Sequence, residues 1–336
     1  MTEKLNDKKT YFFRDIDPFI HIGTASDRYI GWLGQIYTKE RYEDRIKMRI
    51  KKVGARSFTE EVLPIDSVQE YFEHFDVLEI DYTFYSLLLH KDKESLKLKP
   101  SQNYHVLASY EKQMRIGDSV FLKVPQLIFA RNLYRSGRYI ENESYLNTDI
   151  FTKQFYEPAV KILGEKLGGF IFEQEYQRKQ NRISVKDMAS DLDSFFSSIP
   201  KDDRYHLEMR TESYLSKSMF EVMQKYQVGQ VLSHWTWLPR LLKQFAKPGN
   251  RFINSKQCVV RLITPIGVRY EQTYAMAHPF AHMVEGMLQP EMIAETVALM
   301  KEGIEQGVNM NIIVNNRAGG NAPSIAREIV NHYRSM

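Results

Sequence analysis

The chain has 336 residues, of which 43% are hydrophobic, which is enough for a sizeable core in one or two domains. Its 46 basic and 42 acidic residues nearly balance, at a net charge of +4, and this argues against a dedicated nucleic-acid-binding domain with a clustered basic face. A single cysteine, Cys258, excludes a disulfide framework and a cysteine-rich zinc site and fits a reducing compartment.

No targeting or membrane segment is visible in the sequence. The first ten residues are polar and lack the apolar region of a signal peptide. No run of about 18 apolar residues occurs, so no membrane span is expected. We therefore expect a cytoplasmic protein without a membrane partner.

Eight short apolar runs, most with a polar residue near the C-terminal end, are typical of buried strands. They are Phe19–Thr24, Val77–Thr83, Val120–Val124, Gly168–Glu173, Tyr205–Arg210, Gly229–Ser233, Cys258–Ile263 and Asn309–Asn315.

Amphipathic segments with helical apolar spacing lie between most of these runs. They include 67–75, 150–163, 185–199, 290–304 and, at the end, 324–334. Alternating strands and helices predict parallel strands joined by right-handed crossovers, and eight such strands predict an α/β fold of the TIM type, a (β/α)8 barrel. An open doubly wound sheet is the alternative, but the segment after the first strand, from Gly23 to Arg28, lacks the G-x-G-x-x-G spacing of dinucleotide-binding folds.

We expect a surface arm over residues 1–17 and a single barrel domain over residues 18–336. A charged insertion around 41–61 lies in the first crossover, and 126–148 and 234–254 are further excursions from the barrel. Loops that follow barrel strands lie on the face that carries function.

The polar residues at the C-terminal ends of the strands should converge on one mouth of the barrel. We expect the cations to hold an anion while the carboxylates act as acid or base. The candidate catalytic residues are Glu208, Asp81 and Lys123, and the candidate substrate-binding residues are Arg210, Arg261, Asn315, Asn316, Glu79 and His234.

Structural alternatives stand beside several of these assignments. Glu208 and Arg210 are two apart on one strand and can form an ion pair that only stabilises the barrel. Lys123 can pair with a carboxylate, or can serve as a Schiff-base lysine if burial lowers its pKa. His234 is also compatible with a buried structural histidine, and Cys258 with a small core residue.

The end of the last strand offers a further anion site. Asn315 and Asn316 lead into a turn with Gly319 and Gly320, and the predicted helix follows. A strand, a glycine turn and a helix N-terminus can together bind an anion, although an ordinary tight turn has the same pattern.

No metal site is predicted from the histidines. His278 and His282 have the i,i+4 spacing of a helical metal site, but Pro279 disfavours a helix through both. A divalent ion on carboxylates from different strands stays open, and no cofactor is assigned.

Motifs through most of the chain resemble the domain of unknown function 72 family, also called YecE-like. They are Ile22-Gly-Thr24, Gly31-Trp-Leu-Gly-Gln-Ile-Tyr37, Leu78-Glu-Ile-Asp-Tyr-Thr-Phe-Tyr85, Phe121-Leu-Lys-Val-Pro125, Glu208-Met-Arg-Thr-Glu-Ser-Tyr214 and Asn315-Asn-Arg-Ala-Gly-Gly-Asn-Ala322. The resemblance implies a TIM-type barrel and carries no settled activity.

Departures from the family pattern indicate a divergent branch, with a different ligand as one interpretation. Glu173-Gln-Glu-Tyr176 stands where the family has Q-x-P-P, and Arg261-Leu-Ile-Thr264 where it has R-L-H-G. Asp81 replaces an asparagine, and the 41–61 insertion is longer than usual.

Three functional hypotheses follow. The first is an enzyme, a hydrolase or an isomerase, that acts on a phosphorylated or carboxylated small molecule such as a sugar phosphate at the barrel mouth. The second is a nucleic-acid processing or binding protein that uses the basic insertion and the aromatic and basic loop from Trp235 to Arg251. The third is a binding protein without turnover. The oligomeric state stays open.

Overall fold

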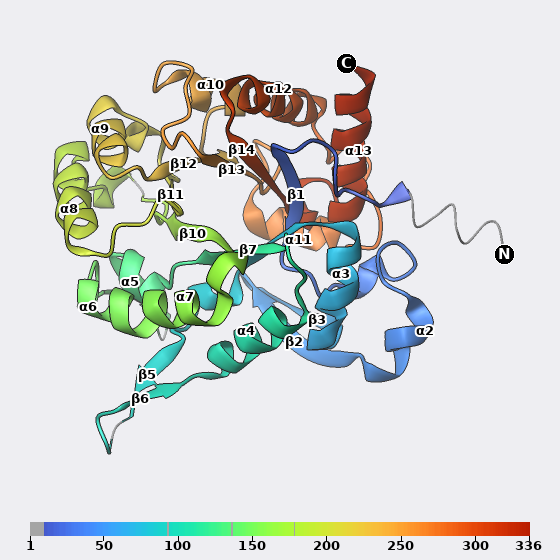
Figure 1. Ribbon diagram of the computed structural model, residues 1–336, viewed down its shortest axis with the longest axis horizontal. Helices are drawn as coiled ribbons and strands as arrows, with labels where there is room; N and C mark the ends of the chain where they lie inside the picture. The colour runs from blue at the N-terminus through green and yellow to red at the C-terminus, as the bar shows by residue number, and fades with distance from the viewer. Residues whose placement is uncertain (1–9, 93, 136, 178) are drawn as a thin grey trace.

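The computed structural model describes residues 10–92, 94–135, 137–177 and 179–336. Within this part of the chain, eight parallel strands close into a barrel in the order β1-β14-β13-β12-β11-β10-β7-β4 (Figure 1). The strands are β1 (Ile20–Ala25), β4 (Val77–Ile80), β7 (Ser119–Lys123), β10 (Leu167–Glu173), β11 (Tyr205–Glu208), β12 (Gly229–His234), β13 (Gln257–Leu262) and β14 (Asn309–Val314). Because β1 pairs with both β14 and β4, the barrel is closed and the TIM-type prediction is confirmed.

Helices pack around the outside of the barrel (Figure 1). Those that follow barrel strands include α3 (Val68–His74), α4 (Gln102–Gln113), α8 (Val185–Ser198), α9 (Lys217–Lys225), α10 (Leu241–Ala246), α12 (Pro290–Gln306) and α13 (Ala322–Ser335). The predicted helix over 150–163 is α6 (Thr148–Phe151) and α7 (Glu157–Leu163), joined by a π-helical turn. Shorter helices are α2 (Lys39–Tyr42), α5 (Gln126–Phe129) and α11 (Tyr270–Ala277).

The barrel interior is built in layers, because successive strand residues face opposite sides of the sheet. An apolar layer fills the middle and consists of Ala25, Val77, Phe121, Ile171, Val231, Val259 and Ile313. Two residues further along six of these strands stand the side chains of the next layer, which are Glu79, Lys123, Glu173, Ser233, Arg261 and Asn315. The strand alternation that gives an apolar core therefore also places a charged layer directly above it.

Three two-stranded hairpins occur in the described part of the chain, and they follow β1, β4 and β7. They are β2 (Lys47–Val53) with β3 (Arg56–Val62), β5 (Leu89–Lys91) with β6 (Leu98–Pro100), and β8 (Asn132–Arg135) with β9 (Arg138–Glu141). The charged insertion expected at 41–61 is mainly the first of these. The β5–β6 hairpin projects away from the barrel at the lower left of Figure 1 and has no counterpart among the predicted elements.

Residues 10–17 pack against the N-terminal end of the barrel, while residues 1–9 of the predicted surface arm lie outside the described residues. Phe13 is 1% exposed and stacks on Phe75 with ring centroids 4.8 Å apart. Nη1 of Arg14 donates to the carbonyl oxygens of Phe72 and Phe75 and lies 2.7 Å from Oδ1 of Asp118. Phe13, within the predicted arm, thus belongs to the hydrophobic core. None of the described helices has the length and apolar character needed to cross a membrane.

Candidate functional site

Arg261 is the centre of a buried charge network at the C-terminal mouth of the barrel. Its guanidinium donates two parallel hydrogen bonds to Glu79, from Nε and from Nη2, each 2.6 Å long. Nη1 donates to Glu208 and lies 3.5 Å from Oε2 of Glu173. The planar fork of the guanidinium thus joins carboxylates from three different strands.

Two further cations complete this network. Nη1 of Arg210 lies 2.9 Å from Oε1 of Glu173, and its Nη2 lies 3.3 Å from Oε2 of Glu208. Lys123 forms an ion pair with Glu173, and Ser233 donates a 2.5 Å hydrogen bond to Glu208. We call the six charged residues the mouth network: Glu79, Lys123, Glu173, Glu208, Arg210 and Arg261. Three positive and three negative charges give it a formal net charge of zero.

The cations of the mouth network keep its buried carboxylates ionised. Burial alone would raise the pKa of Glu173, but Arg210, Lys123 and Arg261 outweigh it and lower this pKa to about 2. For Glu208 the same competition between burial and the two arginines also lowers the pKa. The pKa of Arg261 is raised, because its three carboxylate partners outweigh its burial. Proton exchange at neutral pH is therefore unfavourable at all three of these groups.

Above the network lies a cavity, the mouth cavity, of about 870 Å³, part of which is open solvent. Glu79, Lys123, Glu173, Arg210 and Arg261 form its charged floor. The wall residues are Ala25, Tyr29, Lys51, Asp81, Phe84, Tyr85, Ile263, Tyr270, Tyr274, Phe280, Asn315 and Arg317.

Three charged wall residues lie outside the mouth network: Lys51, which pairs with Glu60, and Arg317 and Asp81. Arg317 stacks on Tyr270, with its Cζ 4.0 Å from the ring centroid, and its buried Nε has no hydrogen-bond partner in the described structure. No ion pair to Arg317 or to Asp81 occurs among the described residues. Nε of Arg210 is also buried without a partner, while its guanidinium lies 5.0 Å from the Trp235 ring centroid.

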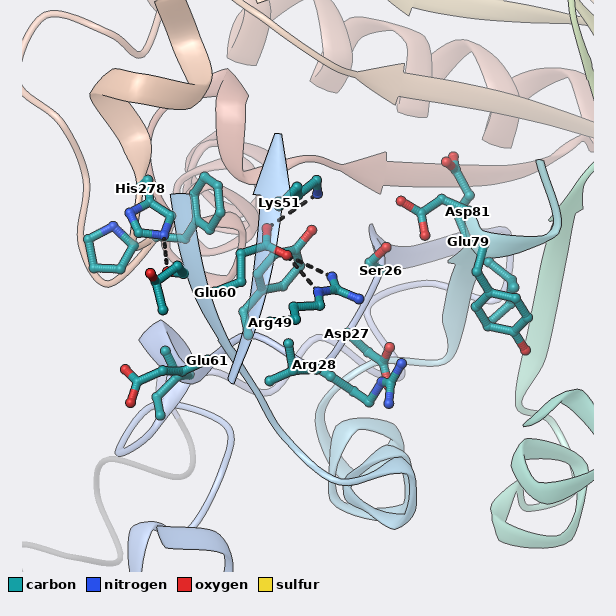
Figure 2. Close-up of a pocket in the computed structure, with 18 of the residues that line it drawn as sticks. Ser26, Asp27, Arg28, Arg49, Lys51, Glu60, Glu61, Glu79, Asp81 and His278 are labelled. Atoms are coloured by element: carbon teal, nitrogen blue, oxygen red, sulfur yellow. Dashed lines mark hydrogen bonds and ion pairs between the residues drawn. The ribbon is translucent and has the colours of Figure 1, made fainter. Parts of the chain in front are cut away.

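A second cavity, the side chamber, adjoins the mouth cavity beneath the β2–β3 hairpin (Figure 2). The two cavities share Tyr29, Lys51, Glu79, Asp81 and Phe280 as wall residues.

Ion pairs across the face of the hairpin that points at the barrel form one wall of the side chamber (Figure 2). Glu60 accepts from Arg49 at 2.8 Å, lies 3.3 Å from Lys51, and accepts a hydrogen bond from Tyr274. Arg28 and Asp27 lie at the other end of the chamber, below Glu79 and Asp81 in this view.

The structure brings most of the predicted site residues together. Asp81, Lys123, Arg210, Arg261, Asn315 and Glu79 all line the mouth cavity. Glu208 lies beneath them, fully buried, with its carboxylate engaged by Arg210, Arg261 and Ser233. The ion pair between Glu208 and Arg210, expected as a structural alternative, is present as part of the larger mouth network.

His234 and Asn316 do not reach the mouth cavity. His234 is 2% exposed, its Nδ1 lies 2.8 Å from the Thr264 oxygen, and it lines a separate small cavity near Glu291. Oδ1 of Asn316 accepts from Nε1 of Trp32 at 3.1 Å and from the Ala322 amide at 2.7 Å. Both residues directly follow an inward-facing residue, so strand alternation turns them outward.

The glycine turn before α13 leaves no opening for an anion. The first amides of the helix are satisfied by the side chains of Asn316 and Asn321, which accept from Ala322 and Ser324. A Cβ at Gly320 would lie 2.5 Å from the oxygen of His282, so a neighbouring segment covers the turn. The predicted anion site is therefore a closed, capped turn.

No group of three or more metal-ligating side chains occurs among the described residues. Helix α11 ends at Ala277, and the His278–Pro279 peptide bond is cis, so no helix carries both His278 and His282. Nε2 of His278 instead lies 3.1 Å from the oxygen of Thr59 on the β2–β3 hairpin.

Sequence reasoning missed Arg317, Arg28 and the aromatic wall of the cavities. Arg317 stands within the quoted Asn315–Ala322 motif, one position beyond the residues chosen. Arg28 lies three residues after the end of β1, in the segment from Gly23 to Arg28 that lacks the dinucleotide-binding spacing. A survey of every cation within a few residues of a strand end would have found both.

Comparison with known proteins agrees with this architecture. No curated protein matches the sequence. The chain is similar to the crystal structure of a DUF72 family protein from Enterococcus faecalis, with 15% identity, 94% of this chain and 95% of that chain covered, and a TM-score of 0.56. A DUF72 family protein from Thermotoga maritima has 14% identity, coverage of 95% and 100%, and a TM-score of 0.53. At this identity the two structures support the fold alone.

The model of the family described as "Protein of unknown function DUF72" matches residues 21–335, which include every barrel strand except the first residue of β1. The chain, a closed parallel barrel with a charged layer at its mouth, belongs to the DUF72 family.

Proposed function

We propose that this protein binds and converts a small molecule with a phosphate or carboxylate group in the mouth cavity. The observation that carries the proposal is Arg317, a guanidinium at the cavity wall without an acidic partner in the described chain. The Tyr270 ring lies against one face of this guanidinium, and its buried Nε lacks an acceptor. A planar guanidinium suits bidentate binding of a carboxylate or phosphate.

The mouth network is assigned a positioning role in this proposal. Its cations are neutralised by buried carboxylates, so Arg261 and Glu208 hold the floor of the cavity in place. Arg210 and Lys123 reach the cavity and can add hydrogen bonds to an anion that Arg317 anchors. Asp81 is then the acid–base candidate, because it faces the cavity and its carboxylate is not held by any described side chain. Proton transfer by one free carboxylate fits an isomerase or a hydrolase.

The test measures affinity for inorganic phosphate, glucose 6-phosphate and citrate by calorimetry. Loss of a charge-assisted hydrogen bond costs about 1.5–3 kcal/mol, so Arg317→Gln should weaken binding at least about tenfold. Arg334→Gln, at an exposed position near the C-terminus, is the matched control and should bind as wild type. The proposal fails if none of the three anions binds wild type, or if Arg317→Gln binds them equally well.

Nucleic-acid binding is a second candidate, and one surface feature favours it. Tyr176 and Trp237 are 42% and 44% exposed and stack on each other with centroids 5.3 Å apart. They line an open groove together with Arg182 and Lys247. Exposed rings beside cations can stack bases and meet phosphates.

An oligonucleotide titration separates the two candidates. Salt-sensitive binding of single-stranded DNA or RNA that Trp237→Ala removes, and that Arg317→Gln leaves intact, favours the groove and the second candidate. If no such binding is observed, the nucleic-acid candidate is rejected and the small-molecule proposal remains.

A further inference from the structure

The side chamber contains polar groups that neither the fold nor the proposed anion site uses. Arg28 lines the chamber, and its guanidinium makes no hydrogen bond or ion pair within the described residues. Tyr82 lines the same chamber, and its hydroxyl group is buried without a partner. A buried hydroxyl without a partner is unfavourable, so an occupant that bonds to it is favoured.

Acceptors stand close to these donors. Asp27 is 4% exposed, and both of its oxygens lie 2.9 Å from the one hydroxyl of Tyr110, which can donate a single proton. At least one oxygen of Asp27 therefore keeps accepting capacity. The Asp81 carboxylate adds a second acceptor at the junction with the mouth cavity.

This mixture of groups selects one ligand chemistry. Among the described residues, Arg28 is the one lining cation without an ion pair, because Arg49 and Lys51 pair with Glu60. Asp27, Glu61 and Asp81 supply carboxylates without an ion pair in the same part of the chain, so a second anionic group in the chamber would be opposed by these acids. A metal ion is disfavoured as well, since the described residues hold no cluster of three ligating side chains. Hydroxyl groups both donate and accept, and they satisfy arginine, carboxylate and tyrosine partners together. The rings of Tyr29 and Phe280, which line both cavities, offer apolar contact for the carbon skeleton.

We infer that the side chamber binds the hydroxylated carbon skeleton of a sugar phosphate whose phosphate lies against Arg317 in the mouth cavity. The inference rests on the proposed function, because it assigns the second half of the same ligand. Tyr29, Lys51 and Asp81 line both cavities and would contact the ligand between its skeleton and its phosphate. Asp81 would then meet the ligand where the skeleton joins its anionic end, which is where an acid–base group acts.

The experiment compares the affinity for glucose 6-phosphate, fructose 6-phosphate and ribose 5-phosphate with that for inorganic phosphate. At least one sugar phosphate should bind wild type about tenfold or more tightly than phosphate does, since each hydrogen bond to a charged group is worth about 1.5–3 kcal/mol. Arg28→Gln and Tyr82→Phe should each reduce this ratio several-fold and leave the affinity for inorganic phosphate unchanged.

The variants are chosen so that folding does not obscure the result. Tyr82→Phe removes only a hydroxyl that has no partner in the described structure, so the fold should be at least as stable as wild type. Tyr134→Phe, on the exposed face of the β8–β9 hairpin, is the matched control and should keep the wild-type ratio.

Each outcome separates the two proposals. If phosphate binds and Arg317→Gln removes it, but sugar phosphates bind no more tightly than phosphate, the side-chamber inference is overturned and the anion site stands. The side-chamber inference is also overturned if both Arg28→Gln and Tyr82→Phe leave the ratio of sugar-phosphate affinity to phosphate affinity unchanged. If no phosphate compound binds wild type, both proposals are overturned.

Discussion

At the scale of single residues, strand alternation decides which polar groups reach the site. Ser233 and Asn315 face the barrel interior, whereas His234 and Asn316, one position later, face outward and serve the fold. The position of a polar residue at a strand end therefore predicts where it lies along the barrel axis. It does not predict whether the side chain points into the barrel or out of it. Val231 and Ile313 belong to the inward-facing apolar layer. A residue two positions after them also faces inward, and a residue three positions after them faces outward.

Two buried histidines make stability depend on pH. Burial lowers the pKa of His206 and of His234 to about 4. The unfolded chain, with a histidine pKa near 6.5, then binds more protons between pH 6.5 and 4. Their contribution to stability is complete above pH 6.5 and is lost as the pH falls toward 4.

We expect His234→Asn to lessen this loss. The Asn amide can donate to the Thr264 oxygen as Nδ1 of His234 does, and it does not titrate. The free energy of unfolding, measured by urea titration at pH 7 and pH 5, should fall less in the variant than in wild type. His105→Asn, at an exposed position on α4, should fall as wild type does. Equal losses in all three proteins would contradict the assignment.

At the scale of elements, one carboxylate joins the two strands of the β2–β3 hairpin to helix α11, beside the contact of His278 with Thr59. Glu60 contacts Arg49, Lys51 and Tyr274, and so links both strands of the hairpin to helix α11. Arg49 and Lys51 lie two apart on one face of β2, so without Glu60 two like charges would face the side chamber.

Glu60→Gln should therefore loosen the hairpin without unfolding the barrel. Amide exchange over residues 47–62 should accelerate about tenfold, the equivalent of about 1.4 kcal/mol, because local opening needs little loss of the core. Glu61→Gln is the control, since Glu61 lies on the opposite face of β3 and is exposed. Equal acceleration by both changes would show that Glu60 has no special part in holding the hairpin.

The elements themselves could be predicted from the sequence, because each strand and helix has a local apolar period. All eight barrel strands occur at the predicted positions, and α8 and α12 match their predicted ranges within about two residues. The pairing of charges could not be predicted. Glu79 and Arg261 are 182 positions apart, and only the closure of the barrel places them opposite each other.

At the scale of the whole molecule, the N-terminal segment packs against the C-terminal end of α3 and the residue before β7. Phe13 stacks on Phe75, and its amide donates to the oxygen of His74 at 2.8 Å. Sequence alone did not predict this, because a run of three aromatic residues, Tyr11, Phe12 and Phe13, has no periodicity from which to infer which one is buried.

Phe13→Ala should cost about 3–5 kcal/mol of unfolding free energy, as expected for removing a buried aromatic ring. Phe12→Ala, at a residue that is 42% exposed, should change stability by about 0.5 kcal/mol or less. Guanidinium titration of both variants checks the difference. Similar values for the two would mean that the segment does not contribute to the barrel core.

The closed charge balance of the mouth network constrains how this protein can diverge. Glu173 contacts three cations and Arg261 contacts three carboxylates, so replacing either one leaves a buried charge without its counterion. A protein that carries one substitution of that kind alone should therefore fold poorly. Changes at these six positions should accumulate in concert across descendants of this chain, while the β2–β3 hairpin drifts independently and adapts the cavities to new ligands.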